Sequence, residues 1–133
     1  MQAGEPWLPY VVQQHTGYGP DHYDLMLQQG EALWTWRLDQ PPGSQPGPLN
    51  ARRIADHRLA YLTYEGPIGG GKGGEGGEGS RGRCRIVDRG RFRMRSLEDG
   101  RLALELAGGD LAGVFELRRV NEAEDLWQLR RSQ

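Results

Sequence analysis

The sequence predicts a mainly β protein whose architecture is a small closed antiparallel barrel, with a sandwich as the alternative. Three observations predict it. Apolar residues mostly alternate with polar ones, which is the period of half-buried strands. Glycine- or proline-bearing connections separate about seven or eight such segments, and no segment has a convincing amphipathic helical pattern. A length of 133 residues suits one domain, so we expect a single domain over residues 1–133.

Three strands are expected before residue 40. Residues 10–14 form the first and residues 22–28 the second, and a tight turn at Gln29–Gly30 leads into a third at residues 31–38. The alternation in the second strand separates two faces, one with Tyr23, Leu25 and Leu27 and the other with His22, Asp24 and Met26. Residues 40–48 contain four prolines and two glycines, which excludes regular structure there.

The middle of the chain combines an extended segment with a glycine-rich one. Residues 53–63 are expected to be extended, with Ile54, Leu59 and Leu62 as candidate core. Nine of the fourteen residues from 69 to 82 are glycine. No strand or helix would overcome that backbone entropy, so we expect a long, flexible surface loop.

A series of arginines follows this loop. Residues 83–87 and 91–95 flank Asp88-Arg89-Gly90, a connection typical of a hairpin, and further strands are expected at residues 101–107, 114–120 and 126–130. Seven arginines and one acid between residues 81 and 95 give a local charge of +6 in a chain of net charge −1. With Cys84, Ile86, Phe92 and Met94 facing inward, one outer face would carry Arg83, Arg85, Arg91, Arg93 and Arg95. That face is either a contact for a nucleic-acid backbone or an ordinary solvated surface.

Composition excludes several classes of protein. The sequence contains no run of about 18 apolar residues, so we expect no membrane-spanning helix. Its first residues lack the basic and apolar regions of a signal peptide. The lone cysteine, Cys84, excludes a disulfide framework and a cysteine-based metal site. The glycine-rich segment lacks the GxxxxGK[ST] pattern of a phosphate-binding loop. We therefore expect a cytoplasmic protein.

The three histidines suggest a metal site. His22 and Asp24 lie two residues apart on one predicted strand, so their side chains point to the same face. His15 comes just after the first predicted strand and could reach that face from the neighbouring strand, and His57 comes from a third segment. Histidine and carboxylate ligands without cysteine suit Mn²⁺, Fe²⁺ or Zn²⁺. The alternative is that these are surface histidines on a polar strand face.

Several stretches resemble the 3′-phosphoesterase domain of bacterial ATP-dependent DNA ligase D. VVQQH at residues 11–15 and HYDLML at residues 22–27 are similar to its VVQKH-type and LHYDFRLE-type strands. A tryptophan-bearing strand follows in both, and ADHRLAYLTYEG at residues 55–66 is similar to VEDHPLDYxxFEG. VDRGRF at residues 87–92 resembles WDRGTW, and residues 100–120 extend the match, so the resemblance covers nearly the whole chain.

The resemblance implies a compact antiparallel barrel that uses Mn²⁺, or another divalent metal such as Zn²⁺, to remove a 3′-terminal phosphate or ribonucleotide from primer ends. It implies a metal-dependent 3′-phosphoesterase, here as a stand-alone and divergent member, acting on DNA or DNA–RNA 3′ ends in repair. End-joining repair proteins are its implied partners. His15, His22 and Asp24 match the metal ligands of the family, His57 matches its phosphate-contacting histidine and Tyr61 matches the tyrosine four residues later.

This chain departs from the family pattern where phosphate is held. Met26 stands where the family has an arginine, and Gln40 stands where it has a lysine. A thioether cannot replace a guanidinium that holds phosphate through two hydrogen bonds. The residues that could compensate are Arg52, Arg53 and Arg58. Two other readings therefore stay open: a catalytically impaired module that binds nucleic-acid ends, and a phosphoesterase acting on a smaller phosphate ester.

Overall fold

A computed structural model describes residues 5–43, 47–69 and 79–132. Apart from one short 3-10 helix, η1, the regular structure in this part of the chain is strand. The elements are β1 (Leu8–Thr16), β2 (His22–Gln29), β3 (Ala32–Leu38), β4 (Leu49–Arg58), η1 (Leu59–Leu62), β5 (Gly66–Pro67), β6 (Arg83–Glu98), β7 (Arg101–Gly108), β8 (Ala112–Asn121) and β9 (Leu126–Arg131).

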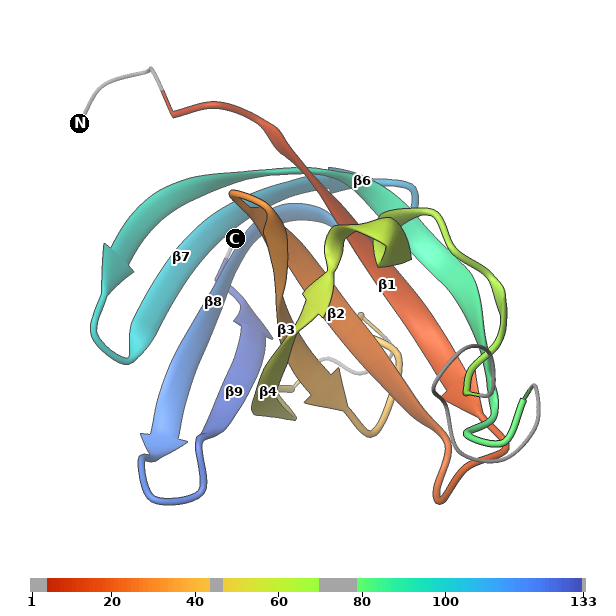
Figure 1. Cartoon of the computed structure of the whole chain (residues 1–133). Helices are drawn as coiled ribbons and strands as arrows, with labels where there is room; N and C mark the ends of the chain where they lie inside the picture. Colours follow the sequence, from red (N-terminus) through yellow and green to blue (C-terminus); the bar gives the residue numbers. More distant parts are fainter. Residues whose placement is uncertain (1–4, 44–46, 70–78, 133) are drawn as a thin grey trace.

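The strands close into a barrel (Figure 1). The order is β1-β2-β3-β4-β9-β8-β7-β6, every neighbouring pair is antiparallel, and pairing of β6 with β1 completes the circle. The two-residue strand β5 adds to the edge of β6. Closure leaves no long unpaired edge between these eight strands, which is how small β proteins avoid edge-to-edge association. The predicted fold class, an all-β closed antiparallel barrel, is confirmed.

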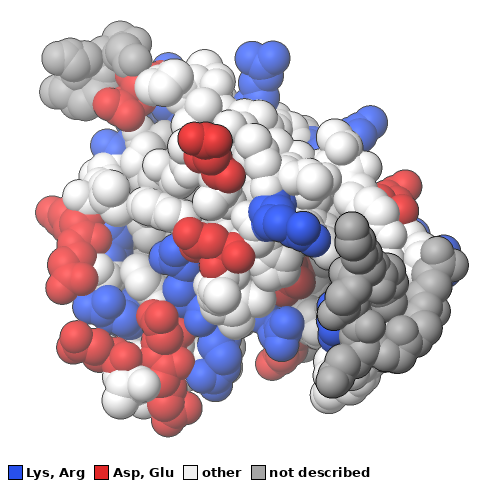
Figure 2. Space-filling view, in the orientation of Figure 1, with Lys and Arg blue, Asp and Glu red and all other residues white. Residues whose placement is uncertain are grey.

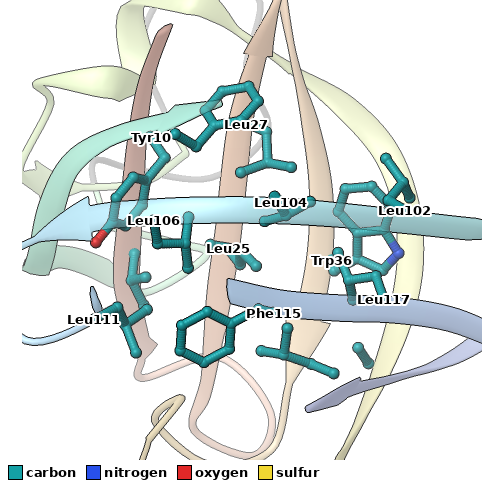
Figure 3. Packing of buried hydrophobic residues seen from close by; sticks show 14 of the residues in the cluster. Tyr10, Leu25, Leu27, Trp36, Leu102, Leu104, Leu106, Leu111, Phe115 and Leu117 are labelled. Atoms are coloured by element: carbon teal, nitrogen blue, oxygen red, sulfur yellow. The ribbon is translucent and has the colours of Figure 1, made fainter. Parts of the chain in front are cut away.

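The main core fills the barrel with the inward-facing residues of alternating strands (Figure 3). Trp36 is fully buried in this core, and its ring meets that of Trp127 edge to face. The predicted inner face of β2 is correct, because Leu25 and Leu27 are fully buried in this core and Tyr23 packs against it. Alternation therefore leaves His22, Asp24 and Met26 on the outer wall.

A second, smaller apolar cluster lies on that outer wall. Val11, Met26 and Leu33 are buried there beneath η1, which contributes Leu59 and Leu62. In Figure 1, η1 lies over the outer side of β1. The prediction of an extended chain over residues 53–63 is correct only as far as Arg58, because residues 59–62 turn into the 3-10 helix that covers this cluster. Ile54 is half-buried and belongs to neither cluster.

The predicted hairpin at residues 88–90 is wrong. Residues 83–98 form the single continuous strand β6, and Asp88-Arg89-Gly90 lies in its middle. Gly90 is needed for close approach rather than for a turn, because a Cβ atom there would overlap the backbone of Ala107 and Gly108 on β7. The Asp88 side chain has hydrogen-bond partners from distant parts of the chain. Its carboxylate accepts hydrogen bonds from the Tyr10 hydroxyl and from the backbone N–H groups of Asp110 and Leu111.

A bulge at Val87 divides the arginines of β6 between two faces. Val12, in the main core, pairs with Asp88, but the next residue of β1, Gln13, pairs with Ile86. The extra residue changes the side to which alternate side chains point, so Cys84 and Ile86 face outward while Phe92 and Met94 face the core. The prediction that all five arginines share one face is therefore wrong.

Acidic neighbours also reduce the charge of this arginine series. Arg93 and Arg95 both lie near Glu105, with nitrogen–oxygen distances of 2.9 and 3.6 Å. Figure 2 shows acidic and basic side chains next to one another on the face in view. The local charge of +6 read from the sequence thus does not form one basic patch, because the bulge divides the arginines between two faces and Glu105 on β7 pairs with Arg93 and Arg95.

The remaining expectations concern the length of the first strand, the glycine-rich and proline-rich segments, and membrane-spanning segments. The first strand is longer than expected, and it includes His15. Of the glycine-rich segment, residues 70–78 lie outside the described residues, as do residues 44–46 of the proline-rich one. Across the described ranges, no helix has the length and apolar character needed to cross a membrane.

A group of ion pairs across β7, β8 and β9 gives a first prediction, which concerns how stability depends on pH. Arg101 donates to Glu116 at 2.6 Å, and Arg130 lies 3.4 Å from the same carboxylate. The hydrogen bond from Arg101 lowers the pKa of Glu116 below its ordinary value of 4.5. The stabilisation of the folded state by the ionised Glu116 carboxylate is therefore fully present when the pH is above 4.5. It is lost as the pH falls through the lower pKa that this group has in the folded state. Urea titrations should show Glu116→Gln to be less stable than wild type at pH 7, with the difference vanishing in acid. Glu98→Gln, which changes an exposed partner of Arg101, should show a much smaller difference.

Candidate metal centre

Three predicted ligands meet on the outer wall where β1 ends and β2 begins. His15 pairs directly with His22 across the two strands, and Gln13 pairs with Asp24. Residues that oppose one another share a face, so the alternation of two strands brings both histidines and the carboxylate together. One donor atom from each of the three lies within 4.8 Å of those of the other two.

Backbone carbonyls determine which nitrogen of each ring carries the proton. His15 Nε2 lies 2.6 Å from the carbonyl oxygen of Arg81, and His22 Nδ1 lies 3.2 Å from that of Pro20. A carbonyl oxygen only accepts, so both of these nitrogens carry hydrogen. In neutral rings the lone pairs are then on His15 Nδ1 and His22 Nε2, which face one another at 3.1 Å. Two facing lone pairs need a cation or a proton between them.

Asp24 adds negative charge at the same point. Its side chain is 5% exposed, and Oδ2 lies 3.7 Å from His22 Nε2. The other oxygen, Oδ1, is buried and has no hydrogen-bond partner among the described residues, although Arg37 Nε lies 3.6 Å away. A buried carboxylate oxygen without a partner is unfavourable, which indicates that the site is arranged for a ligand that it does not itself supply.

The donor set fits a divalent cation. Two imidazole nitrogens and a carboxylate suit Mn²⁺, Fe²⁺ or Zn²⁺, and metal-bound histidines usually donate their second N–H to a carbonyl, as both do here. Two ligand atoms at right angles, each about 2.2 Å from an ion, lie about 3.1 Å apart. The two histidine nitrogens already have a separation of 3.1 Å.

His57 and Tyr61 lie on the same wall but outside this ligand group. His57 pairs with Leu33 on β3, whereas Asp24 pairs with Arg37, four residues further along the same strand. His57 Nδ1 lies 3.2 Å from the Ala55 carbonyl oxygen, and its ring meets that of Tyr61 edge to face at 5.6 Å. The structure thus brings His15, His22 and Asp24 together and places His57 and Tyr61 beside the outer apolar cluster.

Gln13 is a buried residue that sequence reasoning missed. Its side-chain amide donates to the carbonyl oxygens of Tyr61 and Tyr64, at 2.7 and 2.9 Å. Glu65 fixes the same segment to β6, because its carboxylate accepts from the Ile86 N–H at 2.7 Å. These contacts hold η1 and the residues that follow it against the wall next to the ligand group. A glutamine alternating with apolar residues in a strand gives no sign of this role before the pairing is known.

Met26 and the candidate compensating arginines occupy different surroundings. Met26 is buried in the outer apolar cluster. Arg53 points inward, where its guanidinium stacks on Trp34 and Trp36. Arg58 pairs with Ala32 at the opposite end of the barrel from His22. Arg52 lies on the outer wall and donates to the Glu124 carbonyl oxygen.

A hollow where β6 begins, next to the last residues of β1, has a volume of about 370 Å³. Its lining includes Arg83 and Arg85 from β6, together with Glu65 and Cys84. Arg85 donates to Gln14 at 2.7 Å.

Burial raises the pKa of the Cys84 thiol, which favours its packing role over a nucleophilic one. At the end of β1, the exposed ring of Tyr18 stacks parallel to that of His15.

Fold and site together define a small closed β-barrel with a candidate cation site on its outer wall, beside a covering helical turn. A family model described as the DNA ligase D 3′-phosphoesterase domain matches residues 13–119, a range that includes the ligand group, Gln13, His57 and Tyr61. The chain belongs to this family.

Curated relatives give the same result. The multifunctional non-homologous end joining protein LigD of Mycobacterium bovis is 30% identical over 120 residues, covering 84% of this chain. The protein of that name from Pseudomonas aeruginosa is 33% identical over 120 residues, covering 86% of the chain. The match takes up 14% of the length of each relative, so this chain corresponds to a small part of those multifunctional proteins.

Proposed function

We propose that this chain is a divalent-metal-dependent 3′-phosphoesterase that removes a 3′-phosphate or a 3′-ribonucleotide from nucleic-acid ends. The observation that carries the proposal is the pair of facing lone pairs on His15 and His22 beside the carboxylate of Asp24. Membership of the 3′-phosphoesterase family gives this arrangement its chemical context, because the family implies processing of DNA ends in non-homologous end joining.

In this proposal His15, His22 and Asp24 hold the metal, with Mn²⁺ as the first choice and Zn²⁺ as the alternative. A divalent ion bound there would polarise phosphoryl oxygens and lower the pKa of a bound water molecule. The carbonyls of Arg81 and Pro20 keep both histidines in the tautomer that presents a lone pair, and they orient the rings.

His57 and Tyr61 are proposed to address the scissile phosphate. Because the Nδ1–H of His57 points to the Ala55 carbonyl, Nε2 is the nitrogen available to the substrate. A protonated Nε2 would donate to a non-bridging oxygen or to the leaving group. The ring of Tyr61 packs edge to face against His57 and limits its rotation.

The proposed partner is the 3′ end of a DNA or DNA–RNA primer–template. Of the arginines predicted to contact nucleic acid, Arg83 and Arg85 lie at the same end of the barrel as the ligand group, but they alternate with the outward-facing Cys84 and so project from the opposite face of β6. Arg93 and Arg95 share Glu105, and Arg91 lies further along β6, where it pairs with Pro9 at the start of β1. We also propose end-joining repair proteins as partners, in line with the names of the relatives.

A direct assay tests the proposal. The protein is incubated with Mn²⁺ and labelled primer–templates that end in a 3′-phosphate or in one 3′-ribonucleotide. We expect release of phosphate or nucleoside by wild type and by Asp99→Asn, which alters an exposed carboxylate far from the site. His22→Ala should release neither product, because it removes one of only three proposed ligands.

One observation favours a second candidate, a module that binds nucleic-acid ends without turnover. Met26 is buried among apolar residues, where the family pattern has an arginine. Tight binding of the primer–templates without release at any Mn²⁺ concentration would contradict the enzyme and support this module. A third arm with a nucleoside 3′-monophosphate tests for a smaller ester, and faster release from it than from the oligonucleotides would change the substrate class.

A further inference from the structure

We propose that Arg37 binds the terminal phosphate of the nucleic-acid 3′ end and is a specificity-determining residue of this chain. The inference rests on the proposed function, since it assigns a substrate contact beside the same ligand group. It is carried by the position of one arginine, which pairing between β2 and β3 places next to Asp24.

Arg37 is on the outer wall, next to the carboxylate of the ligand group. Its neighbours along β3, Trp36 and Leu38, are fully buried in the main core, so alternation turns Arg37 outward. Its Nε lies 3.6 Å from Asp24 Oδ1, which is beyond hydrogen-bond distance, and 42% of its side chain is exposed. No hydrogen bond joins its guanidinium to another residue in the described part of the chain.

The other side chains next to Asp24 cannot hold a phosphate. Met26, the next outward residue of β2, is an apolar group under η1. The Gln13 amide is occupied by two backbone carbonyls, and the Thr35 hydroxyl is buried and donates to the Leu33 carbonyl. Around Asp24, these strands therefore supply one available cation, that of Arg37.

The surroundings of Arg37 favour an anion. Directly opposite it on β4 is Arg52, and like charges in such a pair are unfavourable. Arg52 has its own partner, Glu124, at 3.8 Å, whereas Asp24 is the only acidic partner that the described residues give Arg37. Once Asp24 serves as a ligand to a cation, Arg37 lacks a full countercharge. A planar guanidinium with unused donors then matches the oxygens of a phosphate.

The experiment compares two oligonucleotides that differ only at the 3′ end. One ends in a hydroxyl and the other in a phosphonate, which cannot be hydrolysed because carbon replaces the bridging oxygen. Fluorescence anisotropy gives the affinity of each in Mn²⁺, and the ratio of the two affinities is the preference for the terminal group. The proteins are wild type, Arg37→Ala, Arg37→Lys and Arg118→Ala, the last changing an exposed strand arginine on β8.

Wild type should prefer the phosphonate end, and Arg37→Ala should reduce that preference about tenfold or more, the loss typical of a charge-assisted contact. Arg37→Lys should keep part of it and Arg118→Ala all of it. The inference is overturned by an unchanged preference, by equal weakening of both oligonucleotides, or by an absence of preference in wild type. Titration of Mn²⁺ alone is the second readout: a loss of Mn²⁺ affinity that matches the loss of preference would make Arg37 a positioning residue for Asp24 and overturn it. Hydrolysis by wild type is scored separately, so failure of the proposed function is seen independently.

Discussion

Asp24→Asn is expected to abolish tight Mn²⁺ binding while leaving the metal-free protein as stable as wild type or more stable. The two effects share one cause. Asp24 is 4% exposed, and one of its oxygens has no hydrogen-bond partner among the residues that the structure describes, so its charge is unfavourable without a bound cation. The asparagine amide has nearly the same shape and would donate to a histidine lone pair. It supplies no negative charge, and Mn²⁺ affinity should fall by more than about 100-fold, beyond the effect of losing an outer-shell partner.

Thermal unfolding with and without Mn²⁺ measures both parts. At a concentration about 100 times its dissociation constant, a ligand adds about 2.7 kcal/mol of stability, which wild type should show as a raised melting temperature. Asp24→Asn should melt at the same temperature with and without the ion, and Asp99→Asn should respond like wild type. Equal stabilisation of Asp24→Asn and wild type by Mn²⁺ would remove Asp24 from the ligand group.

Asp88→Ala is expected to destabilise the barrel by about 3–5 kcal/mol, a large part of the stability of a domain of this size. The buried carboxylate accepts hydrogen bonds from the Tyr10 hydroxyl and from the N–H groups of Asp110 and Leu111. These donors come from β1 and from the turn between β7 and β8. Alanine would leave all three without an acceptor and would open a gap beside the bulge of β6.

Urea unfolding of matched variants tests this prediction. Tyr10→Phe removes one donor and leaves the other two bonds, so its loss should be about 1 kcal/mol. Burial, followed by the hydrogen bond to Asp88, raises the pKa of the Tyr10 phenol, so it stays a donor throughout the range of the assay. Asp99→Ala, at an exposed carboxylate, should have little effect. If Asp88→Ala does not fold, the Tyr10→Phe value decides; a loss near zero there contradicts the proposed network.

Alternation in the sequence was enough to predict a mainly β fold and the two faces of β2, but it left a barrel and a sandwich as alternatives, between which the family resemblance favoured the barrel. The same pattern placed His22 and Asp24 on one side, because that relation depends only on neighbours within a strand. The hairpin predicted at Asp88-Arg89-Gly90 was wrong because a glycine in a strand pattern can have either of two structural roles. It is typical of hairpin loops, but here it lets β6 approach Ala107 of β7, a contact with a partner 17 residues away.

The parts that could not be predicted depend on pairing between strands. Arg37 is next to Asp24 only because β2 and β3 pair in a particular register, and Gln13 reaches Tyr61 across 48 residues of chain. The bulge at Val87, which separates Arg83 and Arg85 from the later arginines, has no local signal in an alternating strand. Local pattern thus predicts which residues share a strand face, and tertiary pairing decides which of them become neighbours.

The position of the ligand group on the outer wall has a consequence for how such a protein can diverge. In β2, the side chains of Leu25 and Leu27 pack inside the barrel, while those of Asp24 and Met26 point outward. Neighbouring residues of one strand are therefore under different constraints: the inward ones must fit the core, and the outward ones must fit the ligand group and its surroundings. Drift in the outward set can alter what is recognised without disturbing the interior, and repacking of the interior leaves the reactive surface in place. An arginine can therefore be lost from one outward position and another gained across the strand pair while the scaffold persists at about 30% identity.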